Sequence, residues 1–252
     1  QISFGGLSAV YLCQQNQKEL RVLKESVVPL NNKASLRDKA REMFQREAAI
    51  LIKVEHEQIA RVVDFFTEEE RTYLLLAHIE GVNLRQLVRE TGALPEERVL
   101  SIAASLLSPL RYLHALTPPV VHRDISPENI ILEEEDRAVL IDFGAANEFL
   151  GTATGTLVGK QCYISPEQFK GKACTASDLY SLGATLYFLV TGEDPPPISS
   201  SSPAEKRPEI SAGTDALVKD LTALEIEDRI KTVEELQVRL TPLLSTGVGN
   251  LP

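Results

Sequence analysis

The first third of the chain alternates short apolar runs with polar turns, the pattern typical of β-strands. Residues 9–12 and 20–24 flank a polar turn and predict a hairpin, and residues 59–66 and 72–76 predict two further strands. Between these pairs, over residues 35–54, apolar residues recur every three or four positions, so we expect a helix there. This part should form a small β-rich unit with one helix.

Helical spacing dominates the rest of the chain. Pro95 and two glutamates open a long amphipathic helix, in which Pro109 should remove a backbone hydrogen bond and cause a bend. A second, strongly apolar helix is expected over residues 176–190, ending at Gly192, and a last one over residues 233–240.

A β-rich front part followed by a helical remainder predicts the α+β class with two lobes and a cleft between them. We place the first lobe at residues 1–80 and the second at residues 81–252. Because the chain opens with Gln almost directly on a glycine-containing segment, we also expect flanking domains outside it.

The charge balance narrows the choice of partners. The formal net charge is −10, and Lys and Arg form no dense cluster, which argues against a nucleic-acid partner and against an electrostatic membrane anchor. The longest apolar run, around residues 184–190, is too short to cross a bilayer, so we expect no direct membrane insertion by this segment. The three widely spaced cysteines suggest free thiols in a reducing compartment, and we therefore expect a cytoplasmic location.

The most specific chemistry lies in two polar motifs close together in the sequence. The run His122-Arg123-Asp124-Ile125-Ser126-Pro127-Glu128-Asn129 is followed by Asp142-Phe143-Gly144. This spacing is typical of a site that presents a hydroxyl group to a metal-bound nucleoside triphosphate. Asp124 would accept the hydroxyl proton, and Asn129 and Asp142 would hold Mg²⁺ against the phosphates.

These motifs resemble those of the protein kinase family, specifically eukaryotic-like serine/threonine kinases of the bacterial type. The resemblance runs from about Phe4 to about Leu240. It implies a bilobal kinase fold and transfer of the γ-phosphoryl group of ATP, with Mg²⁺, to Ser or Thr hydroxyls of protein substrates, with autophosphorylation. Two alternatives stay open: a pseudokinase that serves as a binding or scaffold module, and a small-molecule phosphotransferase.

By this resemblance the nucleotide phosphates are covered by Gly5, Gly6, Ser8 and Val10, although only Gly5 fills one of the family's glycine positions. Lys24, on a strand shared with Val22, would clamp the phosphates, and Glu47 on the predicted helix would hold Lys24 forward. Leu76 would lie behind the adenine, Ala77 and Ile79 would offer it backbone hydrogen bonds, and Asn83 would reach the ribose. Ile131 completes the expected nucleotide-binding set.

Two departures from the family pattern concern the cations of the catalytic site. Ser126 stands where related kinases usually carry Lys, and Lys160 stands where they carry Thr, so we hypothesise that Lys160 supplies the missing ammonium. The resemblance also implies that Arg123 would bind a phosphothreonine among Thr152, Thr154 and Thr156.

Further resemblances concern the residues that hold the catalytic loop in place and the choice of peptide substrate. Asp178 should brace the catalytic loop, and Arg229, which follows Asp228, should pair with Glu167. Glu128 is expected to be available to a basic side chain of the substrate. Asn83 and Phe188, however, replace acids of basic-directed relatives, so we predict weak selection for arginine upstream of the target.

Overall fold

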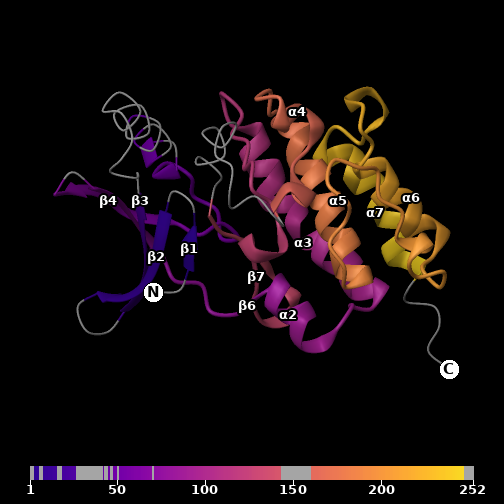
Figure 1. Ribbon diagram of the computed structural model, residues 1–252, viewed down its shortest axis with the longest axis horizontal. Helices are drawn as coiled ribbons and strands as arrows, with labels where there is room; N and C mark the ends of the chain where they lie inside the picture. Colours follow the sequence, from indigo (N-terminus) through magenta and orange to yellow (C-terminus); the bar gives the residue numbers. More distant parts are fainter. Residues whose placement is uncertain are drawn as a thin grey trace. The chain divides into compact units, whose positions relative to one another are not determined.

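The computed structural model describes residues 3–5, 8–15, 19–26, 42, 45, 48–49, 51–69, 71–142 and 160–246. Contacts divide these residues into two compact units, one up to Ile79 and one from Glu80 on. Figure 1 traces both units along the chain.

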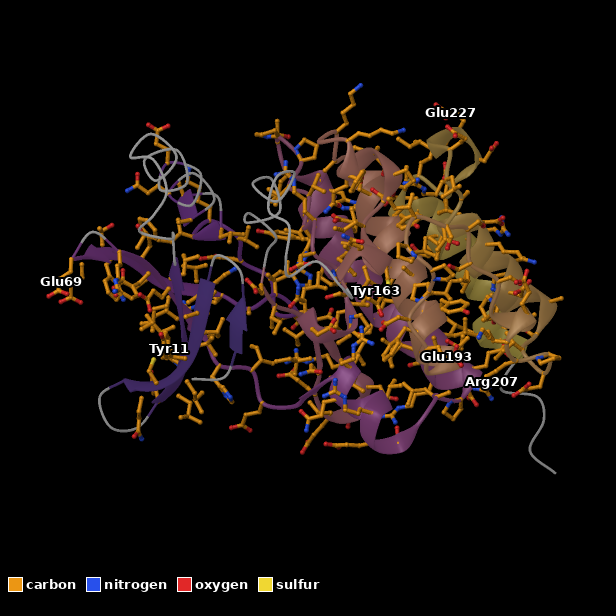
Figure 2. All side chains as sticks on the ribbon, in the orientation of Figure 1. Tyr11, Glu69, Tyr163, Glu193, Arg207 and Glu227 are labelled. Carbon is orange, nitrogen blue, oxygen red and sulfur yellow. The ribbon has the colours of Figure 1, made fainter. Side chains whose placement is uncertain are left out.

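The first unit is built on an antiparallel sheet in the order β1-β2-β3-β5-β4. Tyr11 on β2 and Glu69 in the turn between β4 and β5 are labelled in Figure 2. The predicted hairpin is confirmed as β2 and β3, and the strand predicted at residues 72–76 as β5. The strands are β1 (Ser3–Gly5), β2 (Ser8–Gln15), β3 (Glu19–Ser26), β4 (Val62–Glu68) and β5 (Arg71–Ala77).

Two predicted boundaries in this unit are wrong. The strand expected from residue 59 begins only at Val62, because Ile59 donates its backbone N–H to the His56 carbonyl (3.1 Å) in a turn. The helix expected to reach residue 54 has its last helical residue at Leu51. Ile59 and Val54 are nevertheless buried, so both apolar patterns recorded core positions outside the regular elements.

The second unit is mainly helical. Its helices are α2 (Leu84–Thr91), α3 (Glu96–Ala115), α4 (Pro166–Phe169), α5 (Thr175–Thr191), α6 (Ala212–Leu221) and α7 (Val233–Thr246). A small antiparallel sheet joins β6 (Val82–Asn83), β7 (Ile130–Leu132) and β8 (Ala138–Leu140) in that order. Short 3₁₀ turns occur at Pro127–Asn129, Glu134–Asp136, Lys160–Tyr163, Pro203–Glu205 and Ile226–Asp228.

The core of the second unit surrounds α5, which is buried at every position from Ala176 to Val190. An apolar helix without a polar face must be covered by other elements on all sides. It packs against α3 and α6, while α7 covers another part of α3 (Figure 1). The helix ends at Gly192 as predicted, with φ 77°, a left-handed conformation that glycine adopts without strain.

The other predicted helices also form. The helix that Pro95 opens is α3, and it contains Pro109; α7 continues past its predicted end at residue 240 to Thr246. Among the described residues, no helix combines the length and apolarity needed to span a bilayer. The predicted α+β class, β-rich first and helical afterwards, is confirmed.

Candidate active site

The catalytic motif folds into a tight turn that brings Asp124 and Asn129 together. Asn129 donates its backbone N–H to the Ser126 carbonyl (3.0 Å), and its side-chain Nδ2 donates to the carbonyl of Asp124 (2.8 Å). Pro127 opens the 3₁₀ turn between them, where its fixed φ fits a helical start. The turn therefore holds the Asn129 amide in one orientation beside the Asp124 backbone.

Asp142 is brought to the same place by the backbone. Ile141, the residue before it, donates its N–H to the carbonyl of Asn129 (2.9 Å), so the end of β8 is tied to the catalytic turn. Asp142 itself has a left-handed φ of 56°, an unusual conformation for a residue other than glycine. Such residues are frequent at functional sites, where surrounding structure compensates the strain.

The donor set at this turn suits a hard divalent cation. The Nδ2 of Asn129 is used by Asp124, which leaves the amide oxygen as the atom that could contact a metal. The carboxylate of Asp142 supplies further oxygen. Mg²⁺ prefers such oxygen ligands and typically takes one or two from protein side chains. The two residues predicted as metal ligands therefore fit the ion chemically.

Asp178, at the start of α5, is completely buried, and its carboxylate braces this turn. Its Oδ2 accepts the His122 N–H and its Oδ1 accepts the Arg123 N–H, both at 2.9 Å. The ring Nε2 of His114 on α3 lies 2.9 Å from Oδ2. Arg123 has φ 67°, so the brace holds a second left-handed residue next to Asp124. The contact expected of Asp178 is present.

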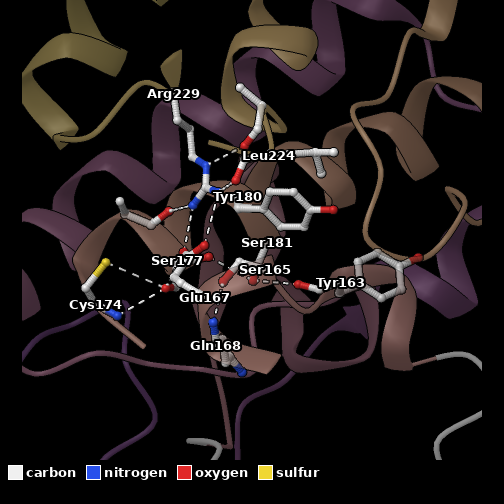
Figure 3. A network of polar contacts seen from close by, with 12 residues as sticks. Tyr163, Ser165, Glu167, Gln168, Cys174, Ser177, Tyr180, Ser181, Leu224 and Arg229 are labelled. Carbon is white, nitrogen blue, oxygen red and sulfur yellow. Dashed lines mark hydrogen bonds and ion pairs between the residues drawn. The ribbon is translucent and has the colours of Figure 1, made fainter. Parts of the chain in front are cut away.

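The expected Glu167–Arg229 pair also forms, inside the polar network of Figure 3. Arg229 donates to both Glu167 oxygens, at 2.7 and 3.1 Å, and Ser177 Oγ donates at 2.6 Å. Burial alone would raise the pKa of Glu167, but these hydrogen bonds outweigh it and lower the pKa to about 2. The carboxylate is therefore ionised at neutral pH and anchors α4 to the segment after α6.

In the first unit, Lys24 lies on the same face of the sheet as Val22 and Leu76, the side chains that we expect to lie against the adenine. It is 7% exposed and stands opposite Val10 on β2 and Leu74 on β5. Val22, two residues earlier and thus on the same face, stands opposite Leu76. Gly5 and Ser8 are cross-strand partners at the β1–β2 turn.

The remaining predicted nucleotide contacts are restricted by local hydrogen bonds. Ala77 donates its N–H to the Arg61 carbonyl (2.9 Å), so only its own carbonyl could serve an adenine. Asn83 caps α2, since its Oδ1 accepts the Gln86 N–H (2.8 Å), which leaves its NH₂ group for a ribose. Ile131 on β7 pairs with Asn83. Ile79 follows β5.

One expectation is corrected in part: one of the two carboxylate oxygens of Glu128 is already engaged within the chain. Its Oε1 accepts a hydrogen bond from Arg85 Nε at 2.7 Å. The sequence analysis missed Arg85 because the two residues are far apart in the chain and no local motif joins them. Phe188, by contrast, does contribute to this region, since its ring lies 4.1 Å from the Arg85 guanidinium carbon.

Several predicted site residues lie outside the described part of the chain. These are Gly6, Glu47, Phe143, Gly144, Thr152, Thr154 and Thr156. Lys160 is described only as the first residue of a 3₁₀ turn, without its side chain.

Comparison with known proteins identifies the family. The protein kinase domain model matches residues 1–245. The kinase domain of PknI from Mycobacterium tuberculosis has a similar fold, with a TM-score of 0.74 at 23% identity over 96% of this chain and 93% of that one. PpkA-294 in its apo form gives a TM-score of 0.76 at 25% identity over 95% of this chain and 93% of that one.

Named relatives agree. Serine/threonine-protein kinase PknA of Nostoc sp. is 34% identical over 76% of this chain and 36% of its own length. Serine/threonine-protein kinase D of Synechocystis sp. is 30% identical over 96% of this chain and 51% of its own length. The chain thus spans about a third to a half of the length of these relatives. Neither name supports a pseudokinase or a small-molecule phosphotransferase. The chain belongs to the protein kinase domain family, among the serine/threonine kinases of bacterial type.

Proposed function

We propose that this domain transfers the γ-phosphoryl group of ATP to Ser and Thr hydroxyls of proteins, including its own, with Mg²⁺ as the metal. The observation that carries the proposal is the single turn in which Asn129 bonds the Asp124 carbonyl while Ile141 bonds the Asn129 carbonyl. This turn gathers a candidate base and two candidate metal ligands on adjoining backbone.

Catalysis by this arrangement consists of positioning and charge neutralisation. Asp124 would orient the acceptor hydroxyl and take its proton. As the hydroxyl oxygen bonds to the γ-phosphorus, the bond from that phosphorus to the β–γ bridging oxygen breaks and ADP leaves. Asn129 and Asp142 would hold the metal, which when bound would offset negative charge on the triphosphate. Lys24, on its buried strand position, binds the phosphates, and Glu47 holds Lys24 in place.

Transfer of radiolabelled phosphate from ATP to the protein itself and to a generic serine-rich protein tests the proposal. We expect wild type to label both, and Asp142→Ala and Asp124→Asn each to lower the rate by at least about 100-fold, since each removes a group acting at the transferred phosphoryl. The surface variant Asp220→Asn should transfer at the wild-type rate. If wild type transferred radiolabelled phosphate neither to itself nor to the generic protein under any condition, the proposal would be refuted.

Metal removal provides a second prediction. EDTA should abolish transfer, and added Mg²⁺ should restore it, whereas Ca²⁺ should restore it poorly because its larger, more flexible coordination shell positions phosphates less strictly. Titration of the EDTA-treated protein with each ion, followed by the same transfer assay, checks this. Full activity in EDTA would contradict a metal-dependent mechanism.

For the missing catalytic-loop cation we propose Lys160. The support is Ser126, whose hydroxyl carries no charge to offer a phosphate and which is 1% exposed. We expect Lys160→Ala to slow transfer about 10-fold or more, and Lys160→Arg to recover part of the loss. A wild-type rate for Lys160→Ala would exclude this role.

For regulation we propose phosphorylation on Thr152, Thr154 or Thr156, with Arg123 as the partner of the phosphate. Support comes from the place of Arg123, whose backbone is held next to Asp124 by Asp178. Mass spectrometry of active protein should find phosphate on at least one of these threonines, and active protein with all three unmodified would contradict the idea.

A further inference from the structure

The guanidinium of Arg85, the second residue of α2, is held by three polar groups from other elements. Its Nε donates to Glu128 Oε1 at 2.7 Å, and its Nη1 lies 2.7 Å from Asp194 Oδ1. Its Nη2 donates to the Tyr163 hydroxyl at 3.0 Å. Figure 2 labels Tyr163, which belongs to the 3₁₀ turn Lys160–Tyr163. We call Arg85, Glu128, Tyr163, Phe188 and Asp194 the Arg85 cluster.

Aromatic rings complete this environment. The guanidinium carbon lies 4.1 Å from the centre of the Phe188 ring and 5.7 Å from that of Tyr163. Cation–π attraction is strong at such distances when water is excluded, and the Arg85 side chain is only 15% exposed. Arginine suits such a place because its planar fork can pair with two carboxylates and stack on a ring at the same time.

The cluster holds two carboxylates for one cation. Tyr163 does not add a negative charge, because burial and its hydrogen bond to Asp194 raise the pKa of its phenol well above the usual value. The phenol therefore stays protonated and donates to Asp194 Oδ1. In addition, Glu128 Oε2 is buried and finds no hydrogen-bond partner among the described residues. The cluster thus has a formal charge of −1 and an unused acceptor.

The location of Glu128 links the cluster to the acceptor side of the site. Glu128 immediately precedes Asn129 and lies in the 3₁₀ turn Pro127–Asn129, whose last residue bonds the carbonyl of Asp124. A peptide whose hydroxyl reaches Asp124 extends about 13 Å over four residues on either side. Side chains of such a peptide can therefore reach Glu128.

We propose that Arg85 fills, from within the chain, a guanidinium site that would otherwise select an arginine of the acceptor peptide. The inference rests on the proposed function, because it concerns the peptide that function phosphorylates. With Arg85 in place, its guanidinium occupies the position between the two carboxylates and against the Phe188 ring, so an arginine of the peptide cannot take that position and is not preferred. Without Arg85, two carboxylates and an aromatic face remain, which is the chemistry that binds an arginine side chain.

Peptide binding measured without ATP tests this directly. The probes are pairs of fluorescent serine peptides. One member of a pair carries one arginine within about four positions of the serine, and the other carries the uncharged isostere citrulline at the same position. For wild type we expect similar dissociation constants for both members of every pair. For Arg85→Ala we expect about tenfold tighter binding of the arginine peptide at one position, equivalent to about 1.4 kcal/mol.

Two control variants separate site creation from a general loss of charge. Arg98→Ala also removes a paired arginine, since Arg98 donates to Asp136 at 2.8 Å, and it should keep the wild-type ratio. In the double variant that combines Arg85→Ala with Glu128→Gln, the preference for the arginine peptide over the citrulline peptide should disappear. If Arg85→Ala does not fold, as judged by circular dichroism, Arg85→Gln takes its place, with the same expected ratios.

The outcomes are distinct. Unchanged ratios in both Arg85 variants, a wild type that already prefers arginine, or a gain that survives Glu128→Gln would each overturn the inference. A wild type that labels no peptide in the transfer assay would instead contradict the proposed function, and the binding ratios would still decide whether the Arg85 cluster is a guanidinium site.

Discussion

At the scale of single residues, buried carboxylates organise the catalytic unit. Asp178 accepts the N–H groups of His122 and Arg123 and also contacts His114, so one side chain satisfies two backbone donors next to Asp124. An unsatisfied buried N–H costs about 1–3 kcal/mol, which makes such a carboxylate hard to replace.

Asp178→Asn tests this brace. The amide keeps one acceptor oxygen but turns an NH₂ group toward an N–H donor, so we expect a loss of about 1–3 kcal/mol in the free energy of unfolding and a clearly lower rate of phosphoryl transfer. Urea denaturation and the transfer assay measure the two effects. The matched change Asp220→Asn breaks an exposed pair with Arg239 and should cost at most about 1 kcal/mol without slowing transfer. Equal effects of the two variants would contradict the brace.

The Glu167–Arg229 pair yields a prediction on pH. The pKa of Glu167 falls from 4.5 to about 2 on folding, so its contribution is complete above pH 4.5 and is lost as the pH drops through about 2. We expect this group to account for about 3 kcal/mol of the acid-induced loss of stability. Urea denaturation between pH 6 and about pH 2 should show a shallower pH dependence for Glu167→Gln than for wild type. Parallel curves would exclude the proposed linkage.

The same pair should be costly to break at neutral pH. Arg229→Met leaves the buried Glu167 carboxylate without its main partner, and we expect a destabilisation of about 3–5 kcal/mol. Loss of the Arg85 guanidinium, in contrast, should act mainly on peptide selection, because Glu128 and Asp194 are both about 40% exposed and can be hydrated.

At the scale of elements, the close packing of α5 against α6 depends on one glycine. A Cβ built on Gly183 would lie 2.5 Å from Leu221 Cβ, which is attached directly to the α6 backbone and cannot swing away. Helix interiors usually favour alanine over glycine by about 1 kcal/mol. Here the steric effect should prevail, because overpacking a core typically costs about 1–3 kcal/mol.

We therefore expect Gly183→Ala to destabilise the protein, although the change is a favourable one in an isolated helix. Gly171→Ala is the comparison: its φ of 74° is unfavourable for alanine, but no atom lies within 4 Å of the added Cβ. It should cost only about 1 kcal/mol, the usual penalty of a left-handed residue. A stabilised Gly183→Ala variant in urea denaturation would show that α6 can move aside.

At the scale of the whole molecule, the proposed nucleotide contacts come from two separate units. Lys24 belongs to the first unit and Asn129 and Asp142 belong to the second. Groups that act on one bound ligand are strongly non-additive when mutated. A shared nucleotide should therefore couple residues that are distant in the sequence.

We expect Lys24→Met and Asp142→Ala each to abolish most of the thermal stabilisation by Mg-ATP, and the double variant to lose little more than either single one. Melting temperatures with and without Mg-ATP give the comparison. Fully additive losses would mean that the two residues do not serve the same ligand.

The local pattern of residues was enough to predict most elements and to point to the residues of the catalytic turn. Strand alternation and helical spacing record which faces are buried, and the roles proposed for Asp124, Asn129 and Asp142 come from one short stretch of chain. Boundaries were wrong where buried residues such as Ile59 and Val54 lie in turns, because burial and regular structure are different properties.

Tertiary structure alone decided the charge pairings that no sequence motif indicates. The partners of Glu128 and Asp194 could not be read from their neighbours, since Arg85 reaches them across many residues of intervening chain. The same is true of His114 beside Asp178 and of the close contact between Gly183 and Leu221. Pairings of this kind depend on how helices pack in three dimensions, and a periodic sequence pattern specifies only which face of each helix is covered.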